Sequence, residues 1–161
     1  MSSEVTIYDF DLNLASGEIL SLSSLKGKII LIVNTASNCS FNQQLVQLQA
    51  LHEKYSDKLV IIGVPCNQFV SQELLPNEKL VSVYLKEFGV TFPLLERSII
   101  NGKKEIPLYK YLKSQKKSLL GFKGIKWNFE KFLVDQTGKV IKRYSTYVVP
   151  NTIEKDLVNI I

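Results

Sequence analysis

The sequence predicts an α/β domain with a central mixed β-sheet flanked by helices and preceded by a β-hairpin. Residues 29–33 and 59–65 are uncharged and rich in β-branched side chains, which is typical of buried strands. A helical pattern between them is long enough for a crossover, so the two strands are expected to be parallel. Residues 129–134 and 139–144 flank a short turn and predict an antiparallel pair. Parallel and antiparallel pairs together indicate a mixed sheet.

The remaining elements follow from turn residues and helical periodicity. They are a hairpin over residues 8–22, helices at about 42–55, 77–88, 107–114 and 151–161, and short extended pieces at 91–95 and 98–100. Asn77 is a candidate N-cap of the second helix, and Pro107 suits the first turn of the third. Without repeats or a linker, residues 1–161 are expected to form a single domain.

Composition excludes several classes of function. The chain has 161 residues, 45% of them hydrophobic, and a net charge of +5 spread along its length. The densest basic group, residues 113–117, lacks interleaved aromatic residues and indicates a solvated loop, so no nucleic-acid partner is expected. The first ten residues show no signal peptide, and no apolar run reaches the roughly 18 residues of a membrane span. We therefore expect a cytoplasmic protein without stable membrane insertion.

Two cysteines, Cys39 and Cys66, are too few for a disulfide framework and form no CxxC motif. In a reducing cytosol such cysteines stay free. The single histidine, His52, lies within the first helical pattern and is expected to pack or to face solvent. Metal binding and Cys–His catalysis are both poorly supported, and no metal or cofactor is predicted.

Cys39 lies on the turn between the first buried strand and the helix that follows it. The unpaired N–H groups of a helix N-terminus favour the thiolate, which is the nucleophilic form of cysteine. Most free cysteines, however, are simply small buried apolar residues. From its position alone, both interpretations of Cys39 stay open.

Four segments carry a family resemblance: residues 34–41 (NTASNCSF), 64–73 (VPCNQFVSQE), 92–93 (FP) and 126–132 (KWNFEKF). With them, nearly the whole chain resembles the glutathione peroxidase family, including its short-loop, thioredoxin-dependent and phospholipid-hydroperoxide members. The resemblance implies a thioredoxin-like fold. It also implies an antioxidant peroxidase, active in the response to oxidative stress, that reduces hydrogen peroxide and organic hydroperoxides, lipid hydroperoxides included.

The resemblance also implies the catalytic centre: the peroxidatic position falls on Cys39, and the other three positions fall on Gln72, Trp127 and Asn128. Thiolate attack on a peroxide leaves a sulfenic acid on sulfur, and the leaving oxygen needs a proton. The indole N–H and the two amide NH₂ groups of these residues can donate hydrogen bonds. Such donors favour the thiolate and stabilise the negative charge that develops on the leaving oxygen. Taken singly, Trp127 also fits a core residue, Gln72 a solvated loop and Asn128 a turn.

The chain departs from the family at the resolving cysteine. In the thioredoxin-dependent members this cysteine falls at or near Tyr84, so the usual resolving disulfide cannot form here. Oxidised Cys39 is then expected to be recycled by glutathione, thioredoxin or another external thiol. Cys66 is the alternative resolving residue, provided that its Cα can come within about 7 Å of that of Cys39. Because Cys66 ends a buried strand, a structural role is favoured for it.

Other departures concern loops and assembly. Ser40, Val70-Ser71 and Leu74 stand where the family commonly has Gly, Gly-Gly and Pro, which leaves loop conformation, rate and substrate preference open. The short segment 110–127 lacks the longer insertion of tetrameric members, which implies a monomer or weak dimer with an open site. Scattered lysines would suit an anionic membrane surface.

Three functions compete. The leading hypothesis is a thiol peroxidase. A second is a peroxide-sensing relay, in which oxidised Cys39 passes its oxidation to a partner protein with little turnover. A third is an inactive thioredoxin-like interaction domain, which retention of Cys39, Gln72, Trp127 and Asn128 disfavours.

Overall fold

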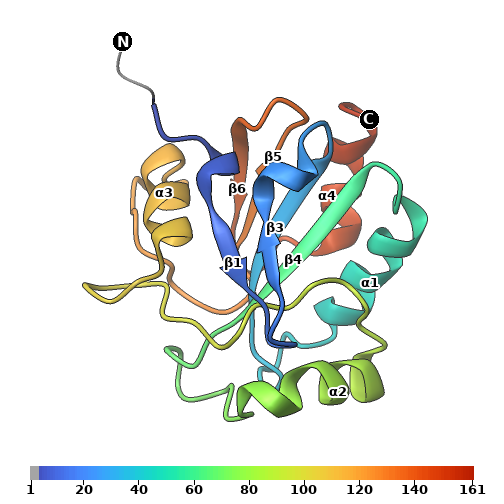
Figure 1. Ribbon diagram of the computed structural model, residues 1–161, viewed down its shortest axis with the longest axis vertical. Coiled ribbons are helices and arrows are strands. Elements are labelled where there is room, and N and C mark those ends of the chain that lie inside the picture. Colours follow the sequence, from blue (N-terminus) through green and yellow to red (C-terminus); the bar gives the residue numbers. More distant parts are fainter. Residues whose placement is uncertain (1–3) are drawn as a thin grey trace.

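The computed structural model of the protein describes residues 4–161, and the elements succeed one another as the sequence predicts (Figure 1). Two short 3-10 helices lie near the N-terminus, at Ile7–Asp9 and Leu22–Leu25. The strands are β1 (Asp11–Asn13), β2 (Ile19–Ser21), β3 (Ile29–Thr35), β4 (Leu59–Pro65), β5 (Lys131–Val134) and β6 (Val140–Tyr144). The helices are α1 (Gln44–Lys54), α2 (Asn77–Phe88), α3 (Pro107–Gln115) and α4 (Pro150–Val158).

The central sheet has four strands in the order β4-β3-β5-β6. β3 and β4 are parallel and joined through α1, whereas β5 runs antiparallel to β3 and β6 antiparallel to β5. β1 and β2 form a separate antiparallel hairpin. The predicted mixed sheet and N-terminal hairpin are therefore confirmed.

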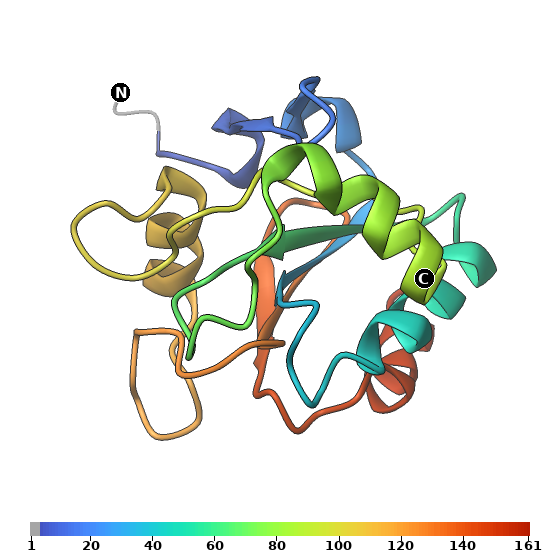
Figure 2. The same cartoon turned by 90° about the horizontal axis from the view of Figure 1, so that it is seen from below.

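Helices cover both faces of the sheet (Figures 1 and 2). On one face, apolar side chains of β3 pack against leucines of α1 and α4, with Leu80 and Tyr84 of α2 at the end of the same cluster. On the other face, Ile30 and Ile32 pack against α3 and the N-terminal segment. Alternate residues of β3 thus face opposite clusters, as the two-residue period of a strand requires.

Two predicted boundaries around Cys39 are corrected. β3 continues through Asn34 and Thr35, which were expected to lie in the turn. Both residues are fully buried, which is tolerated because their polar side chains are hydrogen-bonded. Asn34 Nδ2 donates to the Trp127 carbonyl, and Thr35 Oγ1 bonds the Tyr84 hydroxyl. α1 begins at Gln44 rather than near residue 42. The residues before it form tight turns, in which Asn42 N–H donates to the Cys39 carbonyl and Gln44 N–H to the Phe41 carbonyl.

Other differences are smaller. Asn77 is the first residue of α2 rather than its cap, and its side chain accepts from Arg97 N–H at 2.7 Å. The predicted extended piece at 91–95 forms two isolated bridges, of Leu94 to Gly63 and of Leu95 to Leu14, whereas residues 98–100 form no bridge. A side chain at position 63 would clash, since a Cβ there would lie 2.7 Å from Leu94 Cδ2.

Between residues 4 and 161, every helix is too short or too polar to cross a membrane. The domain assignment, residues 1–161 as one unit, stays a prediction, and its first three residues lie outside the described part of the chain.

Candidate active site

The loops that carry the candidate residues meet at one end of the central sheet. The register pairs Thr35 with Pro65, so β3 and β4 end side by side. β5 begins at this same end, because Lys131 pairs with Val33 near the end of β3 and with Tyr144 at the end of β6. The loops after β3, β4 and β6 and the loop before β5 therefore converge there.

Cys39 lies in the turn between β3 and α1, five residues before the first residue of α1. Its side chain is buried, and Phe41 N–H points at Sγ at 3.4 Å. A backbone N–H aimed at sulfur stabilises negative charge on it. The expected position before a helix is confirmed, although the tight turns separate the thiol from α1 itself.

Gln72 joins this turn to the loop that precedes β5. Its carbonyl accepts from Asn38 N–H at 3.0 Å, and its Oε1 accepts from Asn128 Nδ2 at 2.9 Å. Asn128 is fully buried, and its carbonyl accepts from Thr146 Oγ1 at 2.7 Å. Within the described residues Asn128 Oδ1 is buried without a hydrogen-bond partner. The chain of contacts thus runs from the residue before Cys39 through Gln72 to Asn128.

Trp127 is half-buried, and its ring lies 5.9 Å from that of Phe69, centroid to centroid. The Trp127 carbonyl accepts a hydrogen bond from Asn34 Nδ2 at 3.0 Å, and the Asn34 carbonyl accepts one from Phe129 N–H at 2.7 Å. Phe129 has a φ of 65°, an uncommon backbone state for a bulky residue, directly after Asn128. The end of β3 therefore fixes the turn on which Trp127 and Asn128 lie.

The structure brings Gln72 and Asn128 into direct contact and ties Gln72 to the Cys39 turn. Over residues 4–161, none of the Gln72, Trp127 and Asn128 side chains forms a hydrogen bond to Cys39 Sγ. The catalytic roles of the four residues stay predictions.

Sequence reasoning missed a buried acidic residue beside Gln72. Glu73 is fully buried; its Oε2 accepts from Ser37 N–H at 3.0 Å and its Oε1 from Ser37 Oγ at 2.8 Å. The Tyr84 hydroxyl of α2 also donates to Oε2. Burial and the neighbouring carboxylate hold the pKa of Tyr84 well above its usual value. A glutamate in a polar loop is normally solvated, so no local pattern indicated this arrangement.

Cys66 and Cys39 are both free and buried, but they belong to apolar clusters on opposite faces of the sheet. The Cys66 thiol lies 3.6 Å from Gln68 Oε1, and burial raises its pKa. This environment disfavours the thiolate that attacks a sulfenic acid. Whether Cys66 resolves Cys39 stays a prediction.

The loop before Gln72 has a strained backbone. Val70 and Ser71 have φ values of 56° and 51°, in the left-handed region that glycine adopts without cost. At these two positions the family that the sequence resembles commonly has Gly-Gly. The loop thus keeps a glycine-type conformation although neither residue is glycine.

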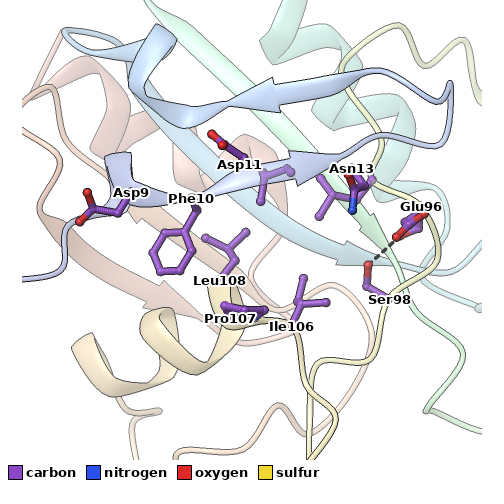
Figure 3. A pocket seen from close by; sticks show the side chains of 11 residues that line it. Asp9, Phe10, Asp11, Asn13, Glu96, Ser98, Ile106, Pro107 and Leu108 are labelled. Atoms are coloured by element: carbon purple, nitrogen blue, oxygen red, sulfur yellow. Dashed lines mark hydrogen bonds between the residues drawn. The ribbon is translucent and has the colours of Figure 1, made fainter.

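A cavity of about 480 Å³ lies elsewhere, between β1 and the start of α3, and is not lined by any of the four candidate residues (Figure 3). Apolar side chains such as Phe10 and Leu108 line it (Figure 3). Its Ser98 hydroxyl already donates to the Glu96 carbonyl, and Asp9 accepts from Thr6. A smaller hollow of about 280 Å³ adjoins the Cys39 turn, between Ser37-Asn38 and α2.

A thioredoxin-like fold with a buried cysteine in the turn after its first central strand agrees with the class of thiol-dependent peroxidases. The chain belongs to the glutathione peroxidase family: the family model described as "Glutathione peroxidase" matches residues 7–113. The fold and family resemblance predicted from sequence are confirmed.

Individual relatives span nearly the whole chain. A Saccharomyces cerevisiae protein named glutathione peroxidase-like peroxiredoxin 2 is 46% identical over 94% of each chain. A probable phospholipid hydroperoxide glutathione peroxidase of Mesembryanthemum crystallinum is 46% identical over 97% of this chain and 92% of its own. The crystal structure of apo Trgpx has a TM-score of 0.79 at 38% identity, covering 98% of this chain and 95% of that one. A thioredoxin-family interchange protein from Chlorobium tepidum, at 18% identity, shares the fold alone.

Proposed function

We propose that this protein is a thiol peroxidase that reduces hydrogen peroxide and organic hydroperoxides, with Cys39 as the attacking residue. One observation carries the assignment of the site. The Cys39 turn holds a backbone N–H against the sulfur, and Gln72 links this turn to Asn128 through hydrogen bonds at 3.0 and 2.9 Å. A donor at the sulfur, with an amide pair tied to the same turn, suits the cleavage of a polar O–O bond.

In the oxidative step, the Cys39 thiolate attacks the terminal oxygen of the hydroperoxide. The S–O bond forms as the O–O bond breaks, which oxidises Cys39 to sulfenic acid and reduces the hydroperoxide to an alkoxide or hydroxide. The leaving oxygen takes a proton and departs as alcohol or water. Within residues 4–161 the Gln72 NH₂ and the Trp127 indole N–H form no hydrogen bond, so both are free to donate as charge develops.

In the reductive step, an external thiol attacks the sulfenic acid, forms a mixed disulfide and releases water. A second thiol then displaces Cys39 as thiol and leaves as the oxidised disulfide. No cysteine occupies position 84, and Cys66 lies in the other apolar cluster. We therefore favour glutathione as reductant, with Cys66 as a structural residue, and keep thioredoxin as the alternative.

The surface around the site suits bulky substrates. The loops after β4, before β5 and after β6 expose apolar side chains at Val70, Leu74, Leu119, Leu120, Phe122 and Tyr147. Lys117, Lys123 and Lys126 are exposed on the same loop as Phe122, and Lys126 Nζ lies 4.5 Å above the Phe122 ring. Apolar tips among lysines favour an anionic lipid surface, so lipid hydroperoxides belong to the proposed substrate range. We further propose a cytoplasmic monomer or weak dimer.

Steady-state turnover tests the proposal. Activity with hydrogen peroxide and with a phospholipid hydroperoxide is measured with glutathione or with thioredoxin and its reductase, using Cys39→Ser as the blank. We expect Cys39-dependent turnover that is faster with glutathione. Oxidation of Cys39 without turnover by either reductant would instead indicate a relay to a partner protein. Equal or lower activity on the phospholipid hydroperoxide would remove lipids as the preferred substrate.

A further inference from the structure

A fully buried carboxylate lies directly under the Cys39 turn. Glu73 accepts from Ser37 N–H at 3.0 Å, from Ser37 Oγ at 2.8 Å and from the Tyr84 hydroxyl. Tyr84 also bonds Thr35 Oγ1 at 3.0 Å, at the last residue of β3. Glu73, Tyr84 and Thr35 are each 0% exposed. This network joins the end of β3, the cysteine turn and α2.

The backbone of Glu73 is held as firmly as its side chain. Its N–H donates to Asn67 Oδ1 at 3.2 Å, and its carbonyl accepts from Arg97 Nη1 at 3.3 Å. The Arg97 guanidinium therefore contacts the backbone carbonyl of Glu73 and not its carboxylate. Within residues 4–161 the Glu73 carboxylate forms no ion pair. Its charge is satisfied by hydrogen bonds alone, and two of the three come from Ser37.

Burying a carboxylate without a cation costs free energy of folding. A role other than stability would explain why Glu73 occupies this position. The bonds of Glu73 reach Ser37, two residues before Cys39, and cross to the buried face of α2. Tyr84 stays protonated at neutral pH, because burial raises its pKa, and its hydroxyl can therefore donate throughout the physiological range. The network can hold the turn in one position relative to Gln72, the residue next to Glu73.

We propose that Glu73 and Tyr84 are positioning residues that fix the Cys39 turn to α2, so that both half-reactions occur with the thiol in one place. The proposal rests on Cys39 being the attacking residue. In the fixed turn the sulfur attacks a hydroperoxide oxygen. The neighbouring N–H groups hydrogen-bond to the leaving oxygen, which takes its proton from solvent water and departs as water or alcohol. The sulfenic acid that remains is then reduced in place by an external thiol of small size, with loss of water.

Two substitutions separate positioning from general stability. Tyr84→Phe removes one hydroxyl, and Glu73→Gln keeps the shape of the side chain while removing its charge and one acceptor oxygen. Tyr55→Phe is the matched control, since Tyr55 also donates its hydroxyl to a carboxylate, Glu154 Oε2 at 2.7 Å, but at the far end of α1. All variants are assayed as full chains, well below the unfolding temperature of each.

The measured quantity is the rate of Cys39 oxidation by hydrogen peroxide divided by its rate of alkylation by iodoacetamide. Both reactions require the thiolate, so the ratio cancels changes in thiolate fraction and reports how well the sulfur is placed against its donors. We expect this ratio to fall about tenfold in Tyr84→Phe and Glu73→Gln and to stay unchanged in Tyr55→Phe.

An unchanged ratio in both variants, whatever their thermal stability, would overturn the positioning role and leave a structural one. An equal fall in Tyr55→Phe would also overturn it, because the effect would then not be specific to the Cys39 turn. If Cys39 of the unsubstituted protein does not react with peroxide at all, the proposed function fails first. A normal reaction of the unsubstituted protein with unaffected variants defeats this inference alone.

Discussion

Asn128 donates its amide N–H to Gln72 Oε1 at 2.9 Å, and this contact occupies the oxygen end of the Gln72 side chain. Because the oxygen of Gln72 is engaged as an acceptor, its NH₂ group is the end left for the predicted role as donor to the substrate. Asn128 is fully buried, so water cannot replace Gln72 as the acceptor of its NH₂ group. Breaking this hydrogen bond would therefore leave a buried donor unpaired, which costs free energy. Asn128 thereby holds the Gln72 side chain in one orientation, which suits the predicted role of Gln72 as the donor.

The Gln72–Asn128 bond predicts non-additive substitutions. We expect Gln72→Ala and Asn128→Ala each to slow Cys39 oxidation by peroxide by roughly 10- to 100-fold, because each removes a donor or its orientation. The double variant should lose clearly less than the product of the two effects, since the residues act through one contact. Stopped-flow rates of Cys39 oxidation in the unsubstituted protein, the two single variants and the double variant complete this double-mutant cycle. Asn159→Ala, at an exposed position, is the control. Fully additive effects would contradict the arrangement.

The two cysteines should behave differently when replaced. Cys66→Ala is expected to keep glutathione-dependent turnover within about twofold of the unsubstituted protein, at a modest loss of stability from the small cavity. Cys39→Ser should abolish turnover, because a hydroxyl cannot replace the thiolate. Turnover assays and unfolding curves check both. A collapse of activity in a folded Cys66→Ala protein would mean that Cys66 resolves Cys39.

The strained loop before Gln72 predicts a stabilising substitution. Val70 is exposed and has a φ of 56°, which is unfavourable for a β-branched residue and free of strain for glycine. We expect Val70→Gly to raise the free energy of unfolding by about 1 kcal/mol. Leu74→Gly, at an exposed position of the same loop without positive φ, should lower it. Urea unfolding measures both, and a destabilised Val70→Gly would count against the loop conformation.

A buried lysine predicts a pH dependence of stability. Lys131 Nζ donates to the carbonyls of Ser145, Thr146 and Val148, and burial lowers its pKa to about 7, while neighbouring Glu130 acts in the opposite direction. Above pH 7 the folded protein releases this proton, whereas the unfolded chain keeps it up to the ordinary lysine pKa near 10.5. The unfolded state then binds more protons, so this residue makes stability rise with pH.

Between pH 7 and pH 9 we therefore expect Lys131 to contribute a rise of roughly 2 kcal/mol in the free energy of unfolding. Below pH 7 both states hold the proton and the contribution becomes constant. Lys131→Met should remove this rise, which urea unfolding of both proteins at several pH values would show. Parallel pH profiles for the two proteins would contradict the lowered pKa.

The sequence predicts the parallel core well because residues 29–33 and 59–65 contain no charge and few small residues. It misses Asn34 and Thr35 as strand residues, since their polar groups are satisfied by Trp127 and Tyr84, 93 and 49 positions away. No local pattern encodes such distant partners. Polar residues after an apolar run normally indicate a turn.

The candidate site divides in the same way. Cys39, Gln72, Trp127 and Asn128 could be selected because their segments match a family, and the contact between Gln72 and Asn128 agrees with that selection. Glu73 could not be recognised as buried, because its partners lie on a turn and a helix that only the fold brings together. The strain at Val70 likewise depends on a backbone conformation that a valine alone does not suggest.

The central claim is that Cys39 reacts with peroxide and then waits for an external thiol. The most direct test is to add one equivalent of hydrogen peroxide to the reduced protein and to record intact mass and peptide maps. We predict one added oxygen located on Cys39, removed by glutathione through a mixed disulfide. No change at Cys39 within minutes would contradict the peroxidase assignment. A loss of two hydrogens, with Cys39 linked to Cys66, would contradict the role given to the external thiol.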